Sequence, residues 1–224
     1  MSAQQNQQNV VVAVDGTSGS GKSSTCRAVA DRLGLRYLDT GAQYRAITWW
    51  MLRQGVDVHD PAAVAARAGE PDIVSGTDPL GPTITVDGTD VSVEIRSDEV
   101  NGAVSPVSAV PEVRARLVDL QRAIVGDGGI VVEGRDIGSV VCPDAEVKVY
   151  LTADPAARAA RRALENGGAD VAATEASLLA RDEIDSGRAV APLTVVDGAT
   201  QIDSTDRTLD EVIDLVVGLV MERV

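Results

Sequence analysis

VVVAVDGTSGSGKSS, residues 10–24, joins a run of apolar residues to a loop rich in glycine and serine. The apolar run Val10–Val14 is typical of a buried parallel strand, which is covered on both of its faces. Residues 16–23 match the pattern GxxxxGK[ST], and the sequence after them predicts a helix from about Lys22 to Leu33, ended by Gly34. A strand, a glycine-rich turn and a helix in this order predict an α/β protein whose turn faces phosphate groups.

The chemistry of this turn, a P-loop, favours binding of a nucleoside triphosphate. Its glycines let backbone amides turn inward around phosphate oxygens, and the helix N-terminus adds the positive end of its dipole. Lys22 is expected to reach the β- and γ-phosphates, and the Ser23 hydroxyl is expected to ligate Mg²⁺. We also expect Lys22 to be exposed when the site is empty. The predicted donor-nucleotide residues of the loop are Gly16, Thr17, Ser18, Gly19, Ser20, Gly21, Lys22, Ser23 and Ser24.

The composition excludes several other classes of protein. The 224 residues are 44% hydrophobic and 24% charged, which indicates a globular chain, and no apolar run is long enough to cross a membrane. The 34 acidic residues outnumber the 20 basic ones, and the net charge of −14 disfavours nucleic acid as a partner. Cys26 and Cys142 are the only cysteines, so a disulfide framework is excluded and a cytoplasmic location is predicted. We expect a monomer.

The order of predicted elements indicates a five-stranded parallel sheet flanked by helices. Residues 1–9 are predicted to be a disordered tail, and residues 10–224 a single domain. From about Asp72 to Glu94 the sequence changes to short alternating stretches separated by Gly, Thr, Asp and Pro. Within it, Asp87-Gly88 predicts a hairpin between strands at 83–86 and 91–95. This region is predicted to be a small inserted antiparallel sheet. The predicted sheet strands are Val10–Val14, Arg36–Asp39, Ile130–Val132, Val147–Leu151 and Gln201–Asp203. Further helices are predicted at about Ala42–Arg53, from Pro61, from Pro111, from Pro155, at about Ala172–Ser186 and over 209–219.

Arginines and carboxylates gather after the predicted strands, in the segments 39–45, 133–136 and 181–188. Arginines in an acidic protein, beside a P-loop, indicate a pocket focused on a second phosphate group. Other interpretations remain open from the residues alone. Arg181 and Asp185 are also spaced as an ordinary surface ion pair of a helix, and Asp39-Thr40 is also typical of a helix cap.

Four collinear segments resemble bacterial cytidylate kinases: VDGTSGSGKSS, YLDTGAQYRA, VVEGRDIGSVVCPDAEVKVYLTA and ARDEIDSGRAVAPL. The resemblance implies a P-loop nucleoside monophosphate kinase that transfers phosphate from ATP to CMP or dCMP. It implies a core (10–40, 104–153 and 189–224), a monophosphate-binding part with its insertion (about 41–103) and a helical lid (about 154–188). GKSS stands where many relatives have GKGT, Gln43 replaces a more usual apolar residue, and 166–173 is less recognisable.

The resemblance also implies roles for individual residues. Those near the acceptor phosphate are Thr40, Tyr44, Arg45, Arg135 and Arg188. Those that recognise cytosine are Ser105, Arg114 and Asp136, and those near the ribose are Arg181 and Asp185. The lid arginines over the triphosphate are Arg158, Arg161 and Arg162. Lys22, Arg135, Arg158 and Arg188 are the expected catalytic groups. No dedicated base is predicted, because a phosphate oxygen is already a charged nucleophile, and Asp39, Glu133 and Asp136 are expected to order water, metal or base.

Two alternatives stay open from the sequence. One is another P-loop kinase that acts on UMP, AMP or a small metabolite. The other is a regulatory module that binds nucleotide without turnover.

Overall fold

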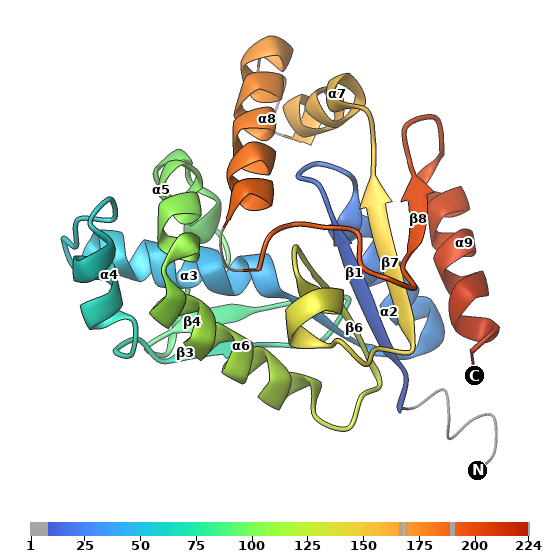
Figure 1. Ribbon diagram of the computed structural model, residues 1–224, viewed down its shortest axis with the longest axis horizontal. Helices are drawn as coiled ribbons and strands as arrows, with labels where there is room; N and C mark the ends of the chain where they lie inside the picture. Colours follow the sequence, from blue (N-terminus) through green and yellow to red (C-terminus); the bar gives the residue numbers. More distant parts are fainter. Residues whose placement is uncertain (1–8, 166–167, 169, 189–190, 224) are drawn as a thin grey trace.

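The computed structural model describes residues 9–165, 168, 170–188 and 191–223. Its centre is a five-stranded sheet in the order β2-β6-β1-β7-β8, in which every neighbouring pair is parallel (Figure 1). The strands are β1 (Val11–Gly16), β2 (Arg36–Asp39), β6 (Ile130–Gly134), β7 (Val147–Thr152) and β8 (Thr200–Asp203). The predicted sheet is thereby confirmed. Of the predicted tail, residues 1–8 lie outside the described residues.

Helices cover both faces of this sheet, as the continuous apolar strands require. The helices are α2 (Lys22–Leu33), α3 (Thr40–Arg53), α4 (Pro61–Arg67), α5 (Asp98–Ala109), α6 (Pro111–Val125), α7 (Pro155–Glu165), α8 (Val171–Gly187) and α9 (Leu209–Met221). A short π-helix, η2, spans Ile137–Val141. α2 and α9 share one apolar core with the sheet, and α6 and η2 share another on the opposite face (Figure 1).

The inserted region forms a third core with α3, α4, α5 and α6. Its antiparallel sheet consists of β3 (Ile73–Ser75), β4 (Ile84–Val86) and β5 (Thr89–Asp90). The predicted hairpin turn is confirmed, with positive φ at Asp87 (50°) and Gly88 (77°). Trp50 on α3 donates its indole N–H to Asp87, 2.9 Å away, which ties the turn to the body of the protein.

The boundaries in and beside this region differ from the predicted ones. The strand predicted over 91–95 is wrong: the strand after the turn, β5, covers only Thr89–Asp90, and Glu94–Arg96 is a 3-10 helix, η1. α5 was not predicted, because Gly102 and Pro106 interrupt its pattern. Its signal was Ser97, which caps the helix, followed by acidic residues in the first turn. α3 begins at Thr40 and not at Ala42, since Asp39 accepts from the Ala42 amide and caps it.

The predicted lid consists of α7 and α8, which stand beyond the carboxyl ends of the strands (Figure 1). α8 is mostly exposed, and its buried side chains are Leu178 and Asp185. The predicted break at Gly167-Gly168 falls partly outside the described residues. Within the described part of the chain, every helix is too short or too polar to span a bilayer.

Candidate active site

A pocket of about 960 Å³, counted with the part open to solvent, lies between the P-loop, α3, α5 and the lid. Parallel sheets bind ligands at the carboxyl ends of their strands, and the pocket lies at that edge. It gathers predicted site residues from every part of the chain. These are Ser18, Gly19, Lys22, Ser23, Thr40, Tyr44, Arg45, Ser105, Arg114, Arg135, Asp136, Arg162, Arg181, Asp185 and Arg188. Its wall also contains Asp39 and Glu133.

Lys22 is buried, contrary to the expectation that it would be exposed. Only 7% of the residue is accessible, because the side chain curls back over its own loop. Its Nζ donates to the carbonyl oxygens of Gly16 (2.9 Å) and Thr17 (2.7 Å). Burial, reinforced by the nearby positive charge of Arg135, lowers the pKa of Lys22 to about 7. The loop therefore supplies hydrogen-bond acceptors for its own lysine.

Five other predicted loop residues do not line the pocket: Gly16, Thr17, Ser20, Gly21 and Ser24. Gly16 has no room for a side chain, because a Cβ would stand 1.9 Å from the Leu151 carbonyl oxygen. Gly21 precedes α2 with φ 86°, in the left-handed region that favours glycine. Ser20 donates its hydroxyl to the Thr17 carbonyl, 2.9 Å away. Ser24 is exposed on α2.

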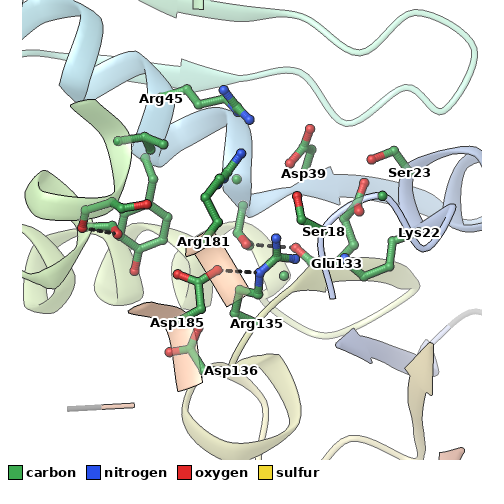
Figure 2. Close-up of a pocket in the computed structure, with 18 of the residues that line it drawn as sticks. Ser18, Lys22, Ser23, Asp39, Arg45, Glu133, Arg135, Asp136, Arg181 and Asp185 are labelled. Atoms are coloured by element: carbon green, nitrogen blue, oxygen red, sulfur yellow. Dashed lines mark hydrogen bonds and ion pairs between the residues drawn. The ribbon is translucent and has the colours of Figure 1, made fainter. Parts of the chain in front are cut away.

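Two carboxylates and a hydroxyl lie beside Lys22. Figure 2 shows Asp39, Glu133 and Ser23 on this side of the pocket. Glu133 is 4% exposed and accepts a hydrogen bond from the Tyr37 hydroxyl. Burial, and then the negative charge of Asp39, raise the pKa of Glu133 to about 7. This side of the pocket is therefore suited to a cation.

The opposite side of the pocket is strongly cationic. Arg45 on α3 and Arg181 on α8 point toward one another, with Arg135 below them (Figure 2). Burial and then the charge of Arg181 lower the pKa of Arg45, and burial and then the charge of Arg135 lower the pKa of Arg181. Within the described residues, the buried Nε of Arg181 has no hydrogen-bond acceptor. Buried guanidinium groups that repel one another favour an anion between them.

Asp185 is the internal counterion of this cluster. Its carboxylate lies 2.8 Å from Arg135 Nε and 3.2 Å from Arg188 Nη2. Asp185 is only 6% exposed, so the alternative of an ordinary surface ion pair with Arg181 is wrong. Arg135 also donates to the Gly16 carbonyl, 2.7 Å away, which joins the cluster to the P-loop.

The far wall holds the three residues matched to cytosine recognition. Arg114 on α6 forms a buried ion pair with Asp136, which follows β6. Arg114 also donates to the Ser108 carbonyl, 3.3 Å away, and its guanidinium lies 5.5 Å from the centre of the Tyr44 ring. Ser105 borders the same wall. The structure thus places a donor, an acceptor and a hydroxyl together.

The three lid arginines on α7 separate instead of gathering over the loop. Arg158 is buried behind the loop, where it donates to Ser18 (2.8 Å) and Ala153 (3.1 Å) carbonyls and pairs with Asp182. Arg161 donates to Ser204, after β8, at its hydroxyl (3.0 Å). Of the three, Arg162 alone borders the pocket.

Sequence reasoning missed two charged residues at this site. Asp182 on α8 accepts from the Ser18 amide of the P-loop, 3.0 Å away. Its signal was weak, because acids are common on exposed helices. Arg96 reaches the pocket from η1 in the insertion, where the sequence predicted a strand.

Comparisons with known proteins agree with this geometry. The family model described as cytidylate kinase matches residues 12–222. A cytidylate kinase of Streptomyces avermitilis is 60% identical over 216 residues, which cover 96% of this chain and 94% of that protein. Those of Streptomyces coelicolor and Nocardia farcinica are 61% and 53% identical, over 96% of this chain and 94% and 95% of theirs.

A crystal structure of an uncharacterized protein from Eubacterium ventriosum shares the fold. The TM-score is 0.54 at 10% identity, over 96% of this chain and 99% of that one. With a match over nearly the whole chain and close relatives that bear the same name, this chain belongs to the cytidylate kinase family.

Proposed function

We propose that this protein transfers the γ-phosphoryl group of ATP to CMP or dCMP, giving ADP and CDP or dCDP. One observation carries the proposal: a cluster of half-buried arginines, Arg45, Arg135 and Arg181, lies between a P-loop and a polar wall suited to a base. An acceptor monophosphate placed among these arginines would lie beside the donor phosphates.

The chemistry requires alignment and charge stabilisation more than proton transfer. An oxygen of the acceptor phosphate attacks the γ-phosphorus, and the bond to the β-phosphate oxygen breaks, so ADP leaves. Arg45, Arg135 and Arg188 would orient the attacking group, and Lys22 would turn from its loop carbonyls to the donor phosphates. Each contact stabilises negative charge that spreads over the transferring group. Arg181 and Asp185 would adjoin the ribose.

The side of the pocket beside Lys22 fits Mg²⁺. Hard oxygen ligands suit this ion, and it usually keeps phosphates and water as its other ligands. The Ser23 hydroxyl would hold it, with Asp39 and Glu133 ordering its water. The raised pKa of the buried Glu133 supports this assignment, because a cation would favour its ionised form. When bound, Mg²⁺ neutralises charge on the donor phosphates.

The far wall would select the base. Cytosine presents a ring nitrogen and a carbonyl as acceptors and an amino group as donor. Arg114 would donate to the first two, and the Asp136 carboxylate would accept from the amino group, with Ser105 completing the set. Uracil places a carbonyl opposite Asp136, which leaves a buried polar group without a partner.

The decisive experiment is an assay of ADP release with ATP and CMP, dCMP, UMP or AMP in turn. CMP and dCMP are expected to be used well, UMP poorly and AMP hardly at all. Asp136→Ala should lower kcat/KM for CMP by about a hundredfold and for UMP far less. Asp119→Ala, which removes an exposed carboxylate from the same wall helix α6, is the control.

The outcomes separate the remaining alternatives. Equal use of CMP and UMP would overturn the assignment of Ser105, Arg114 and Asp136. Failure to release ADP with any acceptor would favour a regulatory module without turnover. We further propose that the protein acts as a cytoplasmic monomer and without nucleic acid, in keeping with its net charge of −14.

A further inference from the structure

The π-helix η2 is capped by a residue from a different strand. Asp15 is at the end of β1 and only 4% exposed. One of its carboxylate oxygens accepts from the Ile137 amide at 2.7 Å, and the other accepts from the Gly138 amide at 2.8 Å. These two amides begin η2, directly after Asp136.

Asp136 itself stands at the position that normally supplies such a cap. It is the N-cap residue of η2, with φ −145° and ψ 29°, and aspartate is among the preferred residues there. Its side chain makes no capping bond within the described chain and instead pairs with Arg114 in the pocket wall. Asp15 therefore accepts the hydrogen bonds from the first amides of η2 that an N-cap aspartate such as Asp136 would normally accept.

The next residue of β1 fixes the same segment from its other side. The Gly16 carbonyl accepts from Arg135, 2.7 Å away, and β1 pairs in parallel with β6, where Asp15 lies opposite Gly134. Two consecutive residues at the end of β1, where the donor loop begins, thus hold the chain on both sides of Asp136. The geometry of the acceptor wall depends on the strand that carries the P-loop.

Burial of the Asp15 carboxylate is unfavourable, because it removes water from a charged group. Burial raises the pKa of Asp15 to about 6, although the two amides act in the opposite direction. A cap made by Asp136 would avoid this second buried carboxylate. The arrangement leaves Asp136 available to the pocket.

We propose that Asp15 is a positioning residue for base selection: by capping η2 in place of Asp136, it keeps the Asp136 carboxylate on Arg114 and turned toward the substrate base. The inference rests on the proposed function of Asp136. In Asp15→Ala, the freed amides attract the Asp136 carboxylate back to its own helix, and Arg114 loses its partner. Discrimination between bases should fall, while binding of ATP changes less.

The test measures kcat/KM for CMP and for UMP in the same preparation of each variant, so that their ratio is independent of the folded fraction. Asp15→Ala should lower the CMP-to-UMP ratio about tenfold or more. Asp15→Asn, which keeps one acceptor oxygen, should lower it less. In an Asp136→Ala background, Asp15→Ala should leave the ratio unchanged, because the group through which it acts is gone.

The control is Asp182→Asn, which changes a carboxylate that accepts from a P-loop amide and not from the amides of η2. It should alter the KM for ATP and leave the base ratio at the wild-type value. A wild-type ratio in both folded Asp15 variants, or an equal loss with and without Asp136, would overturn this inference alone. A wild-type enzyme that does not prefer CMP would overturn the proposed base assignment and this inference with it.

Discussion

The central sheet and the lid are held in place by different kinds of interaction. Val12 on β1 and Val131 on β6 have no exposed surface and pack among other apolar side chains. The lid contacts the loop and pocket through charges, with Arg158 and Asp182 on Ser18 and with Asp185 on Arg135. No solute can replace the apolar contacts of the sheet, whereas the phosphate of a nucleotide can replace a carboxylate as the partner of an arginine. We therefore expect the sheet to keep its contacts when ligands bind, and the lid arginines to exchange carboxylates for phosphates.

The largest expected effect falls at Lys22. This residue lies at the start of α2 beside the central sheet, but its hydrogen bonds to loop carbonyls can be exchanged for bonds to phosphates. Lys22→Ala should lower kcat by about a thousandfold, because it removes stabilisation of developing charge. The thermal midpoint should change by only a few degrees, because the substitution removes the unfavourable burial of an ammonium group together with its hydrogen bonds. Steady-state kinetics and thermal unfolding measure the two effects.

Lys148→Ala is the control, because Lys148 on β7 is the only other lysine. It should retain most of the activity. A Lys22 variant that keeps most of its activity would contradict the assignment of the P-loop.

One truncation made in each region tests the comparison directly. Leu151 on β7 is 0% exposed and Leu178 on α8 is 6% exposed. Leu151→Ala should lower the free energy of unfolding by about 2–5 kcal/mol, as is usual for a buried leucine. Leu178→Ala should lower it by about 1 kcal/mol, because we propose that α7 and α8 can open while the sheet stays folded. Urea denaturation measures both, and equal losses would show that lid and sheet unfold together.

Hydrogen exchange should separate the two regions in a single experiment. We propose that binding of both nucleotides closes the lid, because the arginines then contact phosphates in place of carboxylates. Amides of α7 and α8 should exchange more slowly with both nucleotides bound than without them. Those of α2 and α9 away from the loop should change little. Equal protection of α7 and α8 in the two states would contradict lid closure.

The smallest expected effect is a pH dependence of stability that arises at Lys22. Its pKa is about 7 in the folded protein and 10.5 as the ordinary value, so the unfolded state binds more protons between these limits. The free energy of unfolding should therefore rise with pH through this window. Lys22→Met should lack this contribution, as urea denaturation at the two ends of the window will show. If the free energy of unfolding of Lys22→Met rises with pH by the same amount, the pH dependence arises from other groups.

The sheet could be predicted because its signals are local. Val10–Val14, the P-loop and Gly34 each indicate their structure within a few residues, and the structure has them nearly where expected. α5 could not be predicted in this way. Its Gly102 and Pro106 weaken the helical pattern, and burial against α3, which lies far away in the sequence, helps to stabilise it.

The candidate site was predictable in its residue types and not in its pairings. Arg158 and Arg161 are three residues apart on α7 and so are neighbours on the helix surface, yet one contacts the P-loop and the other contacts Ser204 after β8. These contacts depend on how the helix packs across the sheet edge. The burial of Lys22 depends likewise on the path of its own loop. Local patterns carry no signal for either.

The pocket carries its own counterions, and this bears on how fast products leave. Asp185, which pairs with Arg135 and Arg188, would compete with a bound phosphate for the same guanidinium groups. Binding is therefore an exchange of anions, and part of the attraction for a nucleotide is offset when the carboxylate is displaced. A pocket of unpaired arginines would retain two nucleoside diphosphates tightly and turn over slowly. We propose that this internal competition lets a diphosphate depart as the Asp185 carboxylate returns to its arginines.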